Sequence, residues 1–236
     1  MNKVLTIAWK ELSGYFRSPL AYIILVITVG VFNIFFFMII DQNREASLKD
    51  IFLVMEFMFV FLIPLLTMRL FAEEKANGTM EFLMTTPTSN TTIVLGKYLG
   101  SLGFFSLIIL FTSVYYFIIE YYASPDRMAS LGGYLGIWLE GAMFLSVGML
   151  ASSWTKSQTV AAMTSYVILF LLYFSVSFVE YVGGLLESVV RAASTMTHFA
   201  NFAVGLIAFE DIVYYISITL FCIALTRLNI ESHLWD

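Results

Sequence analysis

Charged residues are scarce in this chain. Only 12% of its 236 residues are charged, and 60% are hydrophobic, whereas an ordinary soluble domain carries about 25% charged residues. A soluble fold could not hide that much apolar surface, and no polar stretch is long enough for a separate soluble domain. We therefore expect a single membrane domain over residues 1–236.

Basic residues, cysteine and histidine are also few. The formal charge of -5 leaves no basic stripe for nucleic acid. The single cysteine, Cys222, excludes an intramolecular disulfide. Two histidines, His198 and His233, are too few and too far apart for a metal site made by protein ligands alone. The sequence therefore predicts no metal site on this chain and no nucleic-acid partner.

A phosphate-binding P-loop is missing as well. Such a loop needs Gly, four residues, Gly-Lys and then Ser or Thr. Gly96-Lys97 is preceded at the required position by Thr91 and followed by Tyr98. The apolar segments also lack a catalytic pattern typical of an intramembrane enzyme. We expect no catalytic residue and no cofactor on this chain.

Long apolar runs fill most of the sequence. About 20 residues of helix are needed to cross ~30 Å of hydrocarbon, and runs such as 22–32 lack the alternation of a barrel strand. Helix is then the only remaining way to satisfy the backbone in lipid. The sequence predicts an all-α membrane protein whose six transmembrane helices cover 20–40, 51–71, 99–119, 131–151, 160–179 and 212–228.

Positive charge favours an orientation with both termini in the cytoplasm. With the N-terminus inside, eight lysine and arginine residues fall on the inner side and four on the outer side. The inner set is Lys3, Lys10, Arg17, Arg69, Lys75, Lys97, Lys156 and Arg227, and the outer set is Arg44, Lys49, Arg127 and Arg191.

The segment 2–18 has the pattern of an interfacial helix. Polar residues recur at spacings of three and four, and an apolar stripe lies opposite them. Pro19 predicts a break before the first span. The polar stripe is Lys3, Thr6, Lys10, Ser13 and Arg17, and the apolar stripe is Leu5, Ala8, Trp9, Leu12 and Phe16.

The segment 72–92, between the second and third spans, carries the most informative polar pattern. Asn77-Gly78 predicts a helix stop and turn. Thr79 can cap a new short helix with Glu81 in its first turn. Pro87 ends that helix, and Thr88 or Ser89 can cap the next one. This geometry suits a coupling element that fits a groove on another protein, or equally a solvated loop that contains charges.

Three groups of residues resemble the type-2 ABC transporter permeases, especially the subgroup of gliding-motility and nitrous-oxide-reductase accessory permeases. They lie at the start, in the central loop and near the end of the chain, so the resemblance covers most of it. The groups are Glu11, Tyr15, Phe16, Ser18-Pro19 and Tyr22; Met68, Arg69, Phe71, Ala72, Glu73-Glu74-Lys75, Gly78-Thr79-Met80-Glu81, Leu83, Pro87, Val94 and Gly96-Lys97-Tyr98; and His198, Phe199, Phe202, Gly205, Asp211 and Tyr214-Tyr215.

The resemblance implies a non-catalytic half-transporter in the bacterial inner membrane. Two six-span permeases, expected here as a homodimer, would each sit on a separate ABC ATPase subunit that binds ATP and Mg. A further membrane or periplasmic subunit is compatible with it. The residues that would receive the ATP-driven motion are Glu73, Glu74, Lys75, Gly78, Thr79, Glu81 and Pro87.

Two carboxylates fall within predicted spans. Glu140 lies near the membrane midplane, where it costs several kcal/mol unless paired, protonated or hydrated. Gly132, Gly133, Gly136 and Gly148 share its neighbourhood, so we expect this face to be turned toward protein. Glu140 is either a structural hydrogen-bonded residue or part of a substrate path or dimer seam. Glu56, near the outer end of the second span, is expected to snorkel or to be capped.

Residues 180–211 are too apolar for a free outer loop. Gly183-Gly184 break the chain, and Glu187 with Arg191 supports a short helix whose apolar face is Leu185, Leu186, Val189 and Val190. The next 12 residues, 198–209, make only about 18 Å of helix. We expect a re-entrant hairpin with Glu210 and Asp211 at the water boundary. The resemblance implies that it closes the outer end of the path, with His198, Phe199, Phe202, Gly205 and Asp211 as the outer gate.

The leading interpretation is thus a permease that couples ATP hydrolysis on another chain to export or to mechanical transmission. A secondary transporter would need inverted repeats and discontinuous helices, and neither is visible. A non-transporting membrane scaffold is the other alternative.

Overall fold

Helices make up nearly all of the protein. The computed structural model describes residues 3–43, 46–80, 88–177 and 185–232, and no strand occurs in these ranges. Six helical segments within them are long and apolar enough to cross a membrane, which confirms the all-α membrane fold. The helices are α1 (Lys3–Arg17), α2 (Pro19–Asn43), α3 (Lys49–Thr67), α4 (Ala72–Ala76), α6 (Asn90–Thr112), α7 (Val114–Tyr122), α8 (Arg127–Ser153), α9 (Gln158–Phe174), α10 (Leu185–Ala193), α11 (Thr195–Ala203) and α12 (Phe209–Ser232).

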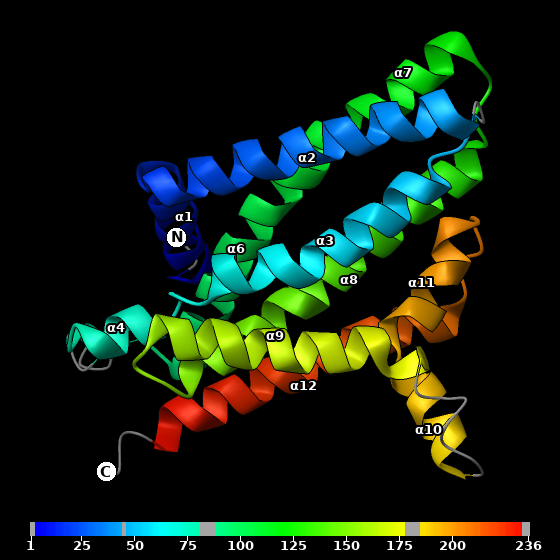
Figure 1. Ribbon diagram of the computed structural model, residues 1–236. Helices are drawn as coiled ribbons and strands as arrows, with labels where there is room; N and C mark the ends of the chain where they lie inside the picture. Colours follow the sequence, from blue (N-terminus) through cyan, green and yellow to red (C-terminus); the bar gives the residue numbers. More distant parts are fainter. Residues whose placement is uncertain (1–2, 44–45, 81–87, 178–184, 233–236) are drawn as a thin grey trace.

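The six segments contain α2, α3, α6, α8, α9 and α12, and the second continues into α4 and the third into α7. Figure 1 shows α1, α4 and the last turn of α12 at one end of the bundle, called here the α1 end. The opposite end, called the α7 end, carries α7, α10 and α11. Because the number of spans is even, the last turn of α12 lies at the same end as α1.

Helix α8 is the centre of the bundle, and α3, α6, α9, α11 and α12 pack around it. Asp126 caps its first turn, because its carboxylate accepts from the backbone N–H groups of Met128 (2.9 Å) and Ala129 (3.2 Å). Its glycines admit neighbouring side chains: a Cβ on Gly133 would lie 2.0 Å from the Phe52 ring, and one on Gly136 would lie 2.5 Å from the Phe202 Cβ. The expectation that this face is turned toward protein is confirmed.

Helix α1 packs along the first half of α6. Leu5 and Trp9 of its apolar stripe are 61% and 71% exposed, and the location of α1 at the membrane surface stays a prediction. The chain turns at Ser18, and α2 starts with Pro19 at its first helical position, where a missing N–H is tolerated.

The third span begins earlier than the sequence predicted. Helix α6 starts at Asn90, and Ser89 caps it by accepting from Thr92 N–H at 3.3 Å, as the sequence predicted, although the apolar run had placed the span itself only from residue 99. The charged Lys97 marked a loop in the sequence, but it is buried inside the helix and neutralised by two carboxylates.

Candidate functional site

The short helix α4 is fixed to α8 by one serine. Helix α3 ends at Thr67, and the chain turns before α4. The Ser152 hydroxyl accepts from the backbone N–H groups of Phe71 (3.0 Å) and Ala72 (3.1 Å), and it donates to the Met68 carbonyl (2.9 Å). These bonds satisfy buried backbone groups that the turn leaves without helical partners. The position of α4 therefore depends on the end of α8.

The next residue of α8, Ser153, joins two further elements. The Lys75 ammonium of α4 donates to the Ser153 carbonyl. Asn229 of α12 donates to the same carbonyl at 2.7 Å and to the Ser153 hydroxyl at 3.0 Å. The ends of α4, α8 and α12 are thus tied together at the α1 end.

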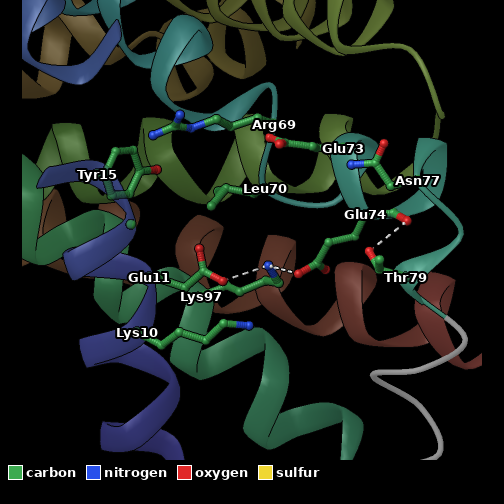
Figure 2. A pocket seen from close by; sticks show the side chains of 11 residues that line it. Lys10, Glu11, Tyr15, Arg69, Leu70, Glu73, Glu74, Asn77, Thr79 and Lys97 are labelled. Atoms are coloured by element: carbon green, nitrogen blue, oxygen red, sulfur yellow. Dashed lines mark hydrogen bonds and ion pairs between the residues drawn. The ribbon is translucent and has the colours of Figure 1, made fainter. Parts of the chain in front are cut away.

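Lys97 connects the remaining elements of this end. Its ammonium lies 2.9 Å from the Glu11 carboxylate of α1 and 2.8 Å from the Glu74 carboxylate of α4, as Figure 2 shows. It also lies 5.3 Å from the centre of the Phe71 ring. The Lys97 side chain is only 3% exposed. A buried cation held by two carboxylates needs both of them in place, so Lys97 couples the positions of α1, α4 and α6.

Tyr15 makes a second buried link between α1 and the spans. Its hydroxyl donates to the Leu66 carbonyl at 3.0 Å and lies 3.1 Å from the Ser101 hydroxyl. The Arg69 guanidinium lies 4.8 Å from the Tyr15 ring centre and donates to Ser18 at 2.9 Å. Burial raises the pKa of Tyr15 to about 12, and the Ser101 hydrogen bond opposes this rise.

A cavity of about 320 Å³ opens beside these links. Figure 2 shows side chains from α1, α4 and the start of α6 around it. Cations and anions alternate on its wall, which suits a polar or charged partner group more than an apolar one. Its lining residues are Lys10, Glu11, Gly14, Tyr15, Arg69, Leu70, Glu73, Glu74, Asn77, Thr79 and Lys97.

The structure brings together most of the predicted coupling residues. Glu73 is exposed at the cavity, and Glu74 and Lys75 hold α4 in place. Gly78 has φ +67°, so the predicted turn after Asn77 is confirmed. The Thr79 hydroxyl donates to the Glu74 carbonyl at 3.3 Å. Glu81 and Pro87, with the short helix expected there, lie outside the described residues.

The sequence interpretation missed Glu11, Tyr15, Lys97, Ser152 and Asn229 as parts of this site. One signal was available: Gly96 and Gly100 are four residues apart, a spacing that lets helices approach closely. A Cβ on Gly100 would lie 2.6 Å from the Glu11 Cβ and 2.8 Å from the Ala8 carbonyl. Only glycine there lets α1 come close enough for Glu11 to reach Lys97.

The predicted outer residues gather at the α7 end. Phe199 and Phe202 of α11 are fully buried, and both lie against Gly136 of α8. Gly205 has φ +82° and touches the backbone of Ala129. The expected short helix with its Glu187–Arg191 pair (3.2 Å) is confirmed as α10.

Asp211 is buried within the protein, and its position relative to the water boundary stays a prediction. It is 3% exposed, and its carboxylate is hydrogen-bonded to His198 Nδ1 (2.6 Å) and to the Asn201 amide (2.9 Å). The folding of α11 back onto α12 brings these partners together, which sequence spacing alone did not reveal. Glu210 is exposed.

The two intramembrane carboxylates are both buried. Glu140 is at the centre of α8, and Glu56 is fully buried on α3. The expectation that Glu56 snorkels or is capped was wrong, because its oxygens reach neither the surface nor a hydrogen-bond partner in the described part of the chain.

These observations define a multi-pass membrane protein with an anchored, partly exposed polar segment at the α1 end. The family model for ABC-2 family transporter protein matches residues 5–219, so the chain belongs to the ABC-2 transporter family. No curated protein matches the chain.

Proposed function

We propose that this chain is the permease subunit of an ATP-driven ABC transporter, powered by an ATPase on a separate chain. Membership of the ABC-2 family supports a permease role, and such permeases partner with an ABC ATPase. On this proposal ATP and Mg are bound by the partner, and this chain transmits the motion to export a substrate or to move another membrane or periplasmic subunit. The gliding-motility and nitrous-oxide-reductase accessory subgroup remains the proposed placement within the family.

The observation that carries the proposal is the anchoring of α4. Helix α4 and the turn after it expose Glu73, Asn77 and Gly78, while Glu74, Lys75 and the backbone of Ala72 are bound to α6 and α8. Lys97 of α6 also binds Glu11 and so extends this link to α1. A segment exposed on one side and bound to several spans on the other can pass a displacement to all of them. A merely solvated loop would not need these buried bonds.

Orientation and assembly complete the proposal. The bacterial inner membrane is its proposed location. The excess of positive charge favours an orientation with the α1 end in the cytoplasm, where an ATPase would reach α4. Six spans per chain suit a pair of permeases, and we propose a homodimer. Native mass spectrometry that finds a stable complex with one permease copy would contradict the dimer.

Purification of the tagged permease from membranes of its own cells tests the proposed function. We expect a soluble subunit with a P-loop to co-purify, and the complex to hydrolyse ATP with Mg. A permease that purifies without any ATPase, under conditions that keep its dimer intact, would favour a secondary transporter or a scaffold.

A further inference from the structure

Three polar groups from three helices meet inside the bundle without partners. Both carboxylate oxygens of Glu56 on α3, both of Glu140 on α8, and the hydroxyl of Thr195 on α11 are buried and have no hydrogen-bond partner among the described residues. Helices α3 and α8 run side by side, with Phe52 against Gly133 and Thr67 against Gly148, so Glu56 and Glu140 lie between these two contacts and their charges repel each other. The Thr195 hydroxyl also acts on the Glu140 carboxylate, although no hydrogen bond joins them. Unsatisfied groups of this kind are rare in folded proteins and indicate an unseen partner.

No described group supplies the missing positive charge. Tyr173 of α9 and Tyr214 and Tyr215 of α12 interact electrostatically with the carboxylates, and a tyrosine side chain carries no positive charge. The Tyr214 hydroxyl donates to the Ala193 carbonyl at 2.7 Å, and the Tyr215 hydroxyl donates to the Thr195 carbonyl at 3.3 Å. Asp211 on α12 adds a further acid, which is held by His198 and Asn201.

Two neighbouring carboxylates cannot both stay ionised in a low-dielectric interior unless a cation compensates their charge. We propose that Glu56, Glu140 and Thr195 form an intramembrane binding site for a small cation, either a proton or a monovalent metal ion. Carboxylate and hydroxyl oxygens suit such an ion, whereas a calcium site uses about 6–8 oxygens. The site does not depend on the proposed ATPase partner.

The position of the site gives the cation a structural role. Thr195 begins α11, and α11 is held on α8 by Phe199 and Phe202. Figure 1 shows α11 at the α7 end, beside α8 and α12. Bound cation therefore favours α11 docked on α8, and loss of the cation leaves two repelling carboxylates beneath it.

Thermal unfolding of the full-length permease in lipid nanodiscs tests this inference. Two series are measured at constant ionic strength: sodium or potassium against N-methylglucamine at fixed pH, and pH 5.5 to 8.5 in N-methylglucamine alone. A cation at about five times its Kd should raise Tm by ~2–4 °C in a chain of this size. A response to sodium or potassium identifies a metal ion, and a response to acid alone identifies a proton.

The matched variants are Glu56→Gln with Glu140→Gln, and Glu120→Gln as the control. Glu120 is an exposed carboxylate paired with Arg127 at 3.2 Å, far from this site. The rise in Tm with sodium, potassium or acid should disappear in the double variant and persist in the Glu120→Gln control. An equal response in all three proteins would overturn the proposal.

If the double variant does not fold, infrared spectroscopy of the wild type tests the proposal instead. Infrared spectra of the wild type at neutral pH should show the carbonyl stretch of a buried protonated carboxyl group if the cation is a proton. Absence of this band together with no response to sodium or potassium would also overturn the proposal.

Discussion

Lys97 is the residue on which the α1 end depends most. Its two partners belong to α1 and α4 and are only 19% and 18% exposed. Removal of the Lys97 ammonium leaves the Glu11 and Glu74 carboxylates without a counter-charge at a place that water reaches poorly. The expected loss in free energy of unfolding lies toward the low end of ~3–5 kcal/mol.

We therefore predict that Lys97→Met lowers Tm by ~6–12 °C. The matched control is Arg127→Met, because Arg127 is 78% exposed in its pair with Glu120 and an exposed pair contributes below about 1 kcal/mol. Differential scanning fluorimetry in detergent compares the two. Equal decreases in Tm would show that the buried Lys97 ion pairs stabilise the protein no more than the exposed Arg127 pair does.

Tyr15 gives a prediction in pH. The folded pKa is raised to about 12 from 10.0 because the hydroxyl is buried. The neutral hydroxyl thus stabilises the fold fully below pH 10, and this contribution is lost as pH rises from 10 to 12. Tyr15→Phe should cost about 1–2 kcal/mol at neutral pH, because two buried partners lose their bond.

The difference in Tm between wild type and Tyr15→Phe should narrow as pH rises from 9 toward 11.5. Tyr22→Phe serves as the control, since Tyr22 is 51% exposed. A difference that stays constant over this range would contradict the buried, protonated state of Tyr15.

At the scale of elements, the contact of α1 with α6 depends on the lack of a side chain. We predict that Gly100→Ala destabilises the protein by ~1–3 kcal/mol, because the added methyl would overlap Glu11 and the Ala8 carbonyl. Gly103→Ala on the same helix is the matched control, since its methyl would lie 3.7 Å from Leu12.

Gly103→Ala should be neutral or stabilising by up to about 1 kcal/mol, because alanine favours helix. Tm and the rate of proteolysis near Ser18 measure both effects. If the two variants behave alike, α1 is not packed on α6 as described.

The elements also show what sequence reasoning can reach. Hydrophobic length predicted all six spans, and Pro19, Asn77-Gly78 and Ser89 predicted where helices break or begin. Charge used as a loop signal failed at Lys97, because its partners Glu11 and Glu74 are 86 and 23 residues away along the chain. Partners that only the packed helices bring together, such as His198 for Asp211, are not visible in residue spacing.

At the scale of the whole molecule, the orientation in the membrane is tested by asking which side reaches the α1 end and which side reaches the α7 end. We predict that Tyr122→Cys and Val204→Cys, both exposed at the α7 end, react with a membrane-impermeant maleimide from the periplasmic side. Asn77→Cys should react only from the cytoplasmic side.

These variants are made on a Cys222→Ala background, because Cys222 is the single native cysteine and is buried. Labelling of Val204→Cys from the cytoplasm would mean that the segment before α12 crosses the membrane, and the six-span arrangement would be abandoned.

The central claim is that an ATPase binds helix α4 and the turn after it and drives the permease from there. Cross-linking from Asn77→Cys, on the Cys222→Ala background in native membranes, tests it most directly. We predict a cross-linked product that contains this permease and a P-loop ATPase, and no such product from Tyr122→Cys at the opposite end. A product from Tyr122→Cys alone, or from neither position in membranes that contain the assembled ATPase, would contradict the account.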